Sequence, residues 1–587
     1  MITTLISWLY IVFLLYLYGS LLLNLIHRIV GSETPHFLPF PLILLIGLAG
    51  VSVFTDYLSL VMPIALLAHL IVLAIGLIYL FFHWRSVHHE ITQTIQALTH
   101  ANRILILVSV LFSLLFVYQS SLGPFNYDTG LYHSQAIQWI EKYRIVPGLG
   151  NLHSRFAFNS LWFLPSALFS FTFWLGQPIH ALNGLMLLMA IIFALGHINT
   201  LIVGAINPSS TFQSLLIFPL AYLGYDSDRF ATDVASPSTD LPATVLVFVV
   251  TTLILHYQNS KLPKVKISAE SDRKEQDVNT AILAIMITIL AVFAVFIKLS
   301  VIPILLFLPY LIVDQFRKNG IVIAALILGI TLFIATPHLI RNVILSGYLI
   351  YPLPQLDLFN WDWKIPLQTV VAESMGVRNW AKMPPGSSPE AVLSSTGWSW
   401  FPAWFNYFKS QPIAQCLGLG IAGFSLSNLL RFRQFNWTKF SVIYAVIAIG
   451  LIFWFFSAPD PRFGYGLLIS FAIMLTLPLL TEALHPLSQR PQMLQLILSV
   501  YVVASFVLSM AHFKFYSEDI NLFWRSAMGY PSVPTQSVTF DRQTIYIPLK
   551  GDQCWNSAFP CTPQIPTNLR LRGRSLQDGF TRLRSAT

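Results

Sequence analysis

The chain has 587 residues, of which 55% are hydrophobic and 10% are charged, with a mean hydropathy of +0.67. This composition excludes a soluble globular domain, because many apolar runs reach the roughly 18 residues that cross a ~30 Å hydrocarbon core. The formal net charge of +9 comes from scattered Lys and Arg, which indicates loop charge near anionic lipid and no nucleic-acid partner.

The first apolar stretch, residues 5–26, has no small-residue cleavage site after it. It is longer than the core of a signal peptide, so we expect a retained span. Residues 83–103 carry Arg85 and Arg103 and form a cytoplasmic loop, because positive residues near span ends stay inside. We therefore expect residues 1–103 to form an N-terminal group of extra transmembrane helices.

A second cytoplasmic loop is expected at residues 259–279, which carry a cluster of Lys and Arg. An even number of crossings must separate two loops on the same side, yet an odd number of apolar stretches lies between them. Residues 158–176, which contain Pro165, are the segment least suited to cross. We expect them to lie on the outer surface, so that residues 123–180 form one long outer loop.

Each further span moves the chain to the other side of the membrane. Following this alternation along the chain predicts a core at residues 104–511 with a second outer loop at residues 338–411. The total is about 14 spans, counted from apolar runs long enough to cross. The tail, residues 512–587, then lies outside, where Cys554 and Cys561 can form a disulfide. A metal site there is less favoured, because no His or second Cys pair lies close by.

Asp128 is the first candidate for chemistry, because it lies where the apolar segment 104–122 should emerge into water. From Asp128 to Tyr143 the apolar positions follow helical spacing, which predicts a helix on the membrane surface. Asp128 is then either the N-cap of that helix or a general base. His133 lies in the same segment.

Asp240 is the second candidate carboxylate. It directly precedes a span and has Pro242 two residues later, so a helix N-cap is the alternative reading. A functional reading places Asp240 beside Asp128 as a second carboxylate or a metal ligand. The same alternation puts Asp226, Asp228 and Asp233 on the outer side.

Three cations are expected on the outer side with these carboxylates: Lys298, Arg341 and Arg462. Lys298 is nearly inside the bilayer, where ionisable residues are costly and usually functional, although snorkelling to the interface is the alternative. For Arg462 the alternative is a structural pair with Asp460. Together the cations predict a site for a phosphate or pyrophosphate group.

A polar and aromatic cluster in the loop at 338–411 is the last candidate. Its aromatic residues can stack on sugar rings or rest at the membrane interface, and the interface is favoured. Its members are Glu373, Arg378, Trp380, Lys382, Trp398 and Trp400. No Gly-rich phosphate loop, His-Glu-x-x-His pattern or Gly-x-Ser-x-Gly elbow is present, which argues against soluble-style nucleotide chemistry.

Over roughly residues 104–510 these features resemble the GT-C superfamily of membrane glycosyltransferases, which includes protein O-mannosyltransferases and the lipid A aminoarabinose transferase. The resemblance rests on a span followed by an outer loop that opens with Asp128, on Pro337 through Arg341-Asn342 to Pro352, and on Pro461-Arg462-Phe463. Many of those relatives carry a second acid where Thr129 stands here, so the resemblance does not extend to a metal.

The resemblance implies an all-α polytopic membrane protein, a GT-C-like helical bundle with outer juxtamembrane helices and a small irregular outer C-terminal domain. It implies an inverting transfer of a sugar from a polyprenyl-phosphate donor to a glycan, lipid or protein acceptor on the outer (periplasmic) face of the cell membrane. No cofactor is implied, and a divalent metal has no support. The residues expected to act are Asp128 and Asp240 in catalysis and His133, Lys298, Arg341 and Arg462 on the substrate.

Three alternatives remain. The first is a flippase or transporter of lipid-linked saccharides, and the second is a polymerase or ligase of surface polysaccharide with a pyrophosphate leaving group. The third is a scaffold without enzymatic activity. The whole chain is also similar to an uncharacterised family of multi-pass bacterial membrane proteins with a Cys-Trp…Pro-Cys-Thr-Pro tail, which is matched here by Cys554-Trp555 and Pro560 to Pro563.

Overall fold

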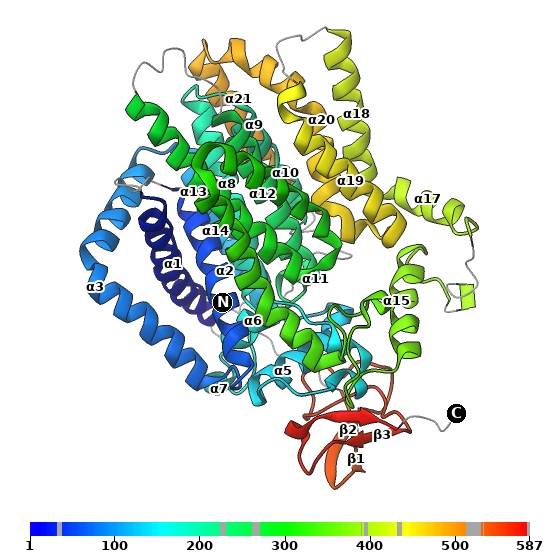
Figure 1. The fold of residues 1–587 in the computed structure, drawn as a ribbon. Coiled ribbons are helices and arrows are strands. Elements are labelled where there is room, and N and C mark those ends of the chain that lie inside the picture. The colour runs from blue at the N-terminus through cyan, green and yellow to red at the C-terminus, as the bar shows by residue number, and fades with distance from the viewer. Residues whose placement is uncertain are drawn as a thin grey trace.

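A computed structural model gives the fold, and Figure 1 shows a mostly helical molecule with a small region of strands near the C-terminus. The predicted Asp226 and Asp228 lie outside the residues that the structure describes. Those residues are 1–31, 38–223, 231–260, 270–388, 390–391, 397–430, 437–511, 530–531 and 533–583.

Within these residues, 12 helices are long and apolar enough to cross a membrane, which fits the predicted polytopic class. The long helices of the first half are α1 (Ile2–Val30), α2 (Phe40–Ser59), α3 (Leu66–Thr99), α4 (Arg103–Ser121), α8 (Leu182–Ile202), α12 (Asp240–Ser260) and α13 (Glu270–Ile297). Those of the second half are α14 (Phe307–Ser346), α18 (Pro412–Leu429), α19 (Ser441–Ser457), α20 (Pro461–Leu487) and α21 (Pro491–Ala511).

The core of the bundle is built around α12 and α13. In these two helices 94% and 89% of the most apolar stretch is buried, against 22% in α18. A helix that is apolar on all sides is suited to such a central position, whereas α18 turns most of its apolar surface outward. Figure 1 accordingly places α3 and α18 at opposite edges of the bundle.

The chain reverses direction inside the long apolar stretch Leu299–Ser346. Gly320 has φ 74° and ψ −167°, a conformation that glycine adopts without steric cost, and α14 breaks there. Ser160 donates to the carbonyl of Ile297 and Asn159 donates to that of His338, whereas Asn319 donates to Asp277. The two ends of the stretch therefore lie together, with Gly320 at the far end of the bundle.

Two short helices, α9 (Pro208–Leu215) and α10 (Ile217–Leu223), occupy the segment between α8 and α12. With eight and seven residues, neither reaches the length of a span by itself. The predicted total of about 14 crossings depends on this pair and on the reversal at Gly320, and it stays a prediction.

Polar contacts define two opposite ends of the bundle. At one end Lys439 donates to Asn259, and Tyr257 donates to Asp314. These residues adjoin the expected cytoplasmic loop at 259–279. At the other end, which we call the site end, lie the first residue of α12, Asp240, and the segment after α4. The relative placement of loops that charge and parity predict is thus consistent with the fold.

The expected outer loop at 123–180 contains only short helices. A π-helical turn at Thr129–His133 leads into α5 (Ser134–Lys142), followed by α6 (Phe163–Leu168) and α7 (Thr172–Leu175). None of them is long enough to cross, which agrees with the expectation for residues 158–176.

The C-terminal tail folds against this loop at the site end (Figure 1). It contains two antiparallel pairs, β1 (Thr535–Phe540) with β2 (Gln543–Pro548) and β3 (Leu569–Leu571) with β4 (Phe580–Arg582). Phe580 donates its amide to the Pro147 carbonyl and the Thr581 hydroxyl donates to the Asp362 carbonyl, which joins the tail to both of the expected outer loops. Cys554 and Cys561 form a disulfide in this tail.

Candidate functional site

Asp128 begins the π-turn but does not cap it. No backbone amide donates to its side chain at this turn, and Asn126 Oδ1 accepts from the Thr129 amide at 3.1 Å instead. The N-cap reading of Asp128 is therefore wrong, because Asn126 performs that role two residues earlier. The side chain of Asp128 is 24% exposed, and its carboxylate contacts other charged groups.

Those groups are two arginines from distant parts of the chain. Arg155 Nη1 lies 3.4 Å from Asp128 Oδ1, and Arg462 Nη1 lies 3.5 Å from Asp128 Oδ2. Both contacts are longer than the about 2.7–2.9 Å of a tight charge-assisted hydrogen bond. One carboxylate thus lies between two guanidinium groups that it does not engage closely.

Each of these arginines also has a carboxylate partner of its own. Arg155 Nε lies 3.3 Å from Glu373 in α15 (Leu367–Ala381), which also accepts a hydrogen bond of 2.8 Å from Ser154. Arg462 Nε lies 3.5 Å from Asp460. Asp460 caps α20 by accepting from the Arg462 amide at 3.0 Å, so the expected structural pair is present.

Arg462 is held in place by tryptophans of the preceding elements. Trp404 in α17 (Phe401–Ser410) donates its indole N–H to the Pro459 carbonyl, and Trp454 donates to the Asp460 carbonyl, both at 2.7 Å. These two hydrogen bonds fix the backbone just before Arg462. The guanidinium group therefore starts from a defined point at the N-terminus of α20.

Lys298 belongs to the same group of charges. It lies where α13 gives way to the 3₁₀-helical segment Leu299–Leu306, and its ammonium contacts the Asp240 carboxylate. Its side chain is 19% exposed, and Nζ lies 4.1 Å from the centre of the Phe463 ring, which Arg462 also covers at 4.9 Å. Lys298 is thus paired within the protein, in contrast to the snorkelling alternative.

His133 lies on the buried side of the π-turn. It is 3% exposed, and its Nδ1 lies 3.1 Å from the Thr129 hydroxyl. Burial lowers the pKa of His133 to about 4, so its imidazole is neutral at neutral pH. A neutral His133 can orient a hydroxyl group but adds no positive charge for a phosphate.

The neighbouring cations set the charge of Asp128. Burial alone would raise the pKa of this carboxyl, but Arg462, supported by Arg155 and Lys298, outweighs burial and holds the pKa below its usual value. Asp128 is therefore ionised at neutral pH. Asp233, which accepts a hydrogen bond of 2.6 Å from Asn126, behaves differently, because burial raises its pKa to about 7.

Arg341 is the predicted site residue that the structure does not bring into this group. Its Nε lies 3.3 Å from Asp56 in α2 and its Nη1 donates to Ser59 at 2.6 Å, with both charged side chains buried. Arg341 is 3% exposed, in contrast to the side chains of Arg155 and Arg462, so an incoming phosphate does not reach its guanidinium. The predicted substrate-binding role of Arg341 is therefore dropped, and Arg341 is a structural ion pair of α14 with α2.

Arg155 is the residue that the sequence prediction missed. It lies within the expected outer loop at 123–180, in a chain with few charges, and that position was the available signal. Glu373 was recognised only as part of the aromatic cluster. Trp398 and Trp400, in the same cluster, stack on each other at 5.9 Å between ring centres, and both rings pack against Phe455.

The resulting site is Asp128 between Arg155 and Arg462, with Lys298 and Asp240 beside them and His133 behind. The site combines an ionised, partly exposed carboxylate with three cations. Each cation has a carboxylate partner of its own and still belongs to the group of charges around Asp128. Such an arrangement can accept a proton and hold an anionic group side by side. Among the residues described, no three His, Cys, Asp or Glu side chains converge in a way that could hold a metal ion.

Comparison with known proteins gives one match. Residues 1–469 match a family described as Domain of unknown function (DUF8201). No curated protein and no solved structure matches the chain.

Proposed function

The chain belongs to the DUF8201 family, and we propose that it is a membrane glycosyltransferase that uses a polyprenyl-phosphate-linked sugar. The observation that carries the proposal is the position of Asp128, with one carboxylate oxygen toward Arg155 and the other toward Arg462. A donor of this type brings its own leaving group, so it needs a base and a phosphate site but no nucleotide site.

Asp128 is the general base of the proposed reaction. It takes the proton of the acceptor hydroxyl, and the acceptor oxygen bonds to the anomeric carbon. The bond from that carbon to the phosphate oxygen breaks, and the electron pair leaves with the lipid phosphate. Because the acceptor attacks from the face opposite the phosphate, the configuration at the anomeric carbon is inverted. General-base help of this kind contributes about 10²–10⁴-fold in rate.

Arg155, Arg462 and Lys298 stabilise the phosphate as its charge grows. The contacts of 3.4 and 3.5 Å to Asp128 support this role, because the guanidinium groups can move to an incoming anion without breaking tight hydrogen bonds. Positioned donors of this kind act on the charge of the transition state. Asp240 keeps Lys298 in place, and His133 orients the acceptor.

Three outcomes of one experiment separate the candidate functions. The protein is reconstituted into vesicles with synthetic polyprenyl-phosphate sugars and candidate acceptors, and the lipid products are analysed. A glycosyltransferase of the proposed type releases polyprenyl monophosphate. Movement of the intact donor to the other leaflet indicates a flippase, and release of a polyprenyl pyrophosphate from a pyrophosphate donor indicates a polymerase or ligase; either result without monophosphate release contradicts the proposal.

A further inference from the structure

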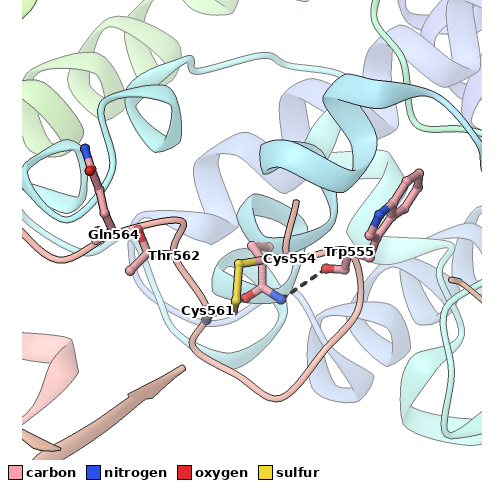
Figure 2. Close-up of a disulfide and its surroundings, with 6 residues drawn as sticks. Cys554, Trp555, Cys561, Thr562 and Gln564 are labelled. Carbon is pink, nitrogen blue, oxygen red and sulfur yellow. Dashed lines mark hydrogen bonds between the residues drawn. A yellow bond between two sulfur atoms is a disulfide. The ribbon is translucent and has the colours of Figure 1, made fainter. Parts of the chain in front are cut away.

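One loop of the C-terminal tail, residues 552–561, lies directly against the π-turn that follows Asp128. The disulfide between Cys554 and Cys561 closes this loop, and both residues are fully buried. Figure 2 shows the disulfide with Trp555 beside it, and a hydrogen bond to the Trp555 backbone carbonyl. We call residues 552–561 the clamp loop.

Backbone and side-chain hydrogen bonds join the clamp loop to the π-turn and α5. The Trp555 amide donates to the Gly130 carbonyl at 2.8 Å. Gln135 Nε2 donates to the Trp555 carbonyl at 3.1 Å, and Gln135 Oε1 accepts from the Cys561 amide at 3.0 Å. A single buried side chain, Gln135, therefore bonds to both sides of the disulfide loop.

The Trp555 ring covers Gly130 so closely that no side chain fits there. A Cβ atom on Gly130 would lie 2.5 Å from the ring of Trp555, which is 7% exposed. On the other side of Asp128, the Tyr127 hydroxyl donates to Asp552 at 2.6 Å, and Gln553 donates to the Tyr127 carbonyl at 3.0 Å. The clamp loop thus contacts the chain both immediately before and shortly after Asp128.

π-helical turns are rare and occur mostly as single turns within α-helices, frequently at functional sites. Here the Ser134 amide donates to the Thr129 carbonyl, and the turn carries Asp128 at its start and His133 at its end. Its shape sets where both side chains point. Groups that must be placed within about 0.5 Å need such a supporting shell.

We propose that the clamp loop is a positioning element that holds the π-turn in shape, with Trp555 and Gln135 as its positioning residues. The intact disulfide keeps the loop in one conformation, so an oxidised tail is required for a well-placed Asp128. The role in catalysis rests on the proposed function, whereas the effect on the π-turn does not.

Hydrogen exchange of the backbone amides tests the clamp directly, with the full chain in lipid nanodiscs. The variants are Trp555→Ala and the paired Cys554→Ser and Cys561→Ser. We expect amides of residues 129–135 to exchange at least about tenfold faster in both. Trp555→Ala removes the ring that covers Gly130, and loss of the disulfide loosens the two hydrogen bonds of Gln135 to the clamp loop. Residues 182–202 in α8 serve as the internal reference.

Arg572→Ala is the matched control in the tail. Arg572 binds Asp362 at 2.6 Å, so this variant loosens a different attachment of the same tail. Exchange in residues 129–135 should stay at the wild-type rate. Wild-type exchange in Trp555→Ala, or equal acceleration in Arg572→Ala, overturns the proposal.

Steady-state kinetics of the transfer reaction are a second test, independent of hydrogen exchange. If the proposed transfer occurs, Trp555→Ala should lower kcat while the KM for the donor stays within about twofold, because the cations are untouched. Failure of the wild-type protein to transfer sugar overturns the proposed function alone. A Trp555→Ala protein with faster exchange but unchanged kcat overturns the positioning role alone.

Discussion

The side chain of Asp128 is available for chemistry because Asn126 caps the turn. Asn126 also donates to Asp233, so one amide links the π-turn to the segment before α12. A sequence reading cannot separate these two residues, since Asn and Asp are both good N-caps. Only the turn geometry, with its extra residue per turn, decides which one accepts the backbone amide.

Asp233 makes the stability of the fold depend on pH. Its pKa is raised to about 7 by burial, above the about 3.9 of an unfolded Asp, so the folded protein keeps a proton that the unfolded chain has lost. The contribution of Asp233 to stability should therefore fall as pH rises from about 4 to about 7. His133 acts in the opposite sense between about pH 4 and 6.5, because burial lowers its pKa to about 4. Asp128 adds nothing in this window, because its pKa lies below its usual value.

Thermal unfolding of the solubilised protein at pH 5 and pH 8 measures this effect. The other titrating groups are the same in the wild type and in Asp233→Asn, so the effect of Asp233 is the difference between these two proteins. Asp233→Asn keeps a polar group of the same shape without the titration, so the unfolding temperature of the wild type relative to that of Asp233→Asn should be lower at pH 8 than at pH 5. An equal difference in both proteins would exclude Asp233 as the source.

The Lys298–Asp240 pair should behave as a coupled unit. Lys298→Met leaves the Asp240 carboxylate, which is 9% exposed, without its partner, and removing one member of a buried pair costs about 3–5 kcal/mol. The double variant Lys298→Met with Asp240→Asn removes both charges and should unfold closer to the wild-type temperature. Additive losses in the double variant would show that the pair is not coupled.

At the scale of elements, α1 and α2 pack with their backbones in close contact. A Cβ on Gly47 would lie 1.9 Å from the Leu15 carbonyl oxygen, and one on Gly19 would lie 2.1 Å from that of Ile43. Small residues permit such an approach between membrane helices. These two helices precede the core predicted to begin at residue 104, yet α2 supplies Asp56 to Arg341 and so is part of the core.

Gly47→Ala should therefore destabilise the bundle by about 1–3 kcal/mol, because backbone atoms must move apart. A thermal-unfolding series in one detergent measures the loss. Gly329→Ala is the control, since a Cβ there meets nothing within 4 Å. Equal unfolding temperatures for Gly47→Ala and the wild type would contradict the close packing of α1 on α2.

Several elements could be predicted from sequence because their signals are local. Long apolar runs predicted the long helices. The absence of a good span at residues 158–176 predicted that this segment does not cross, and it contains only short helices. The Cys554–Cys561 spacing gave the disulfide. The π-turn, the clamp loop and the Asp128–Arg155 contact could not be predicted, because they depend on side chains that only the tertiary fold brings together.

The same limit explains the different results for the cations. Lys298 and Arg462 were expected on the outer side with Asp128, and they lie in its group. Arg341 also lies toward the site end of a long helix, but its partner Asp56 belongs to α2, before the core predicted to begin at residue 104. The charge of a residue and its predicted side of the membrane identify candidates for the site. The packing of the helices then determines which of these candidates lie together.

At the scale of the whole molecule, the site end and the opposite end should face different compartments. Asp362 lies at the site end and Glu275 lies near the opposite end, and each is replaced by Cys in a Cys416→Ser background. In intact cells a membrane-impermeant maleimide should label Cys at position 362 and not at 275. Labelling of both positions, or of 275 alone, would contradict the predicted orientation.

The rate of polyprenyl monophosphate release by Asp128→Asn, relative to the wild type, measures what Asp128 contributes as a base. We expect a loss of about 10²–10⁴-fold, because Asn keeps the shape of the side chain but cannot accept the proton. Asp362→Asn, the same change at an exposed position in an outer loop, should retain the wild-type rate. A wild-type rate in Asp128→Asn would contradict the assignment of Asp128 as the general base.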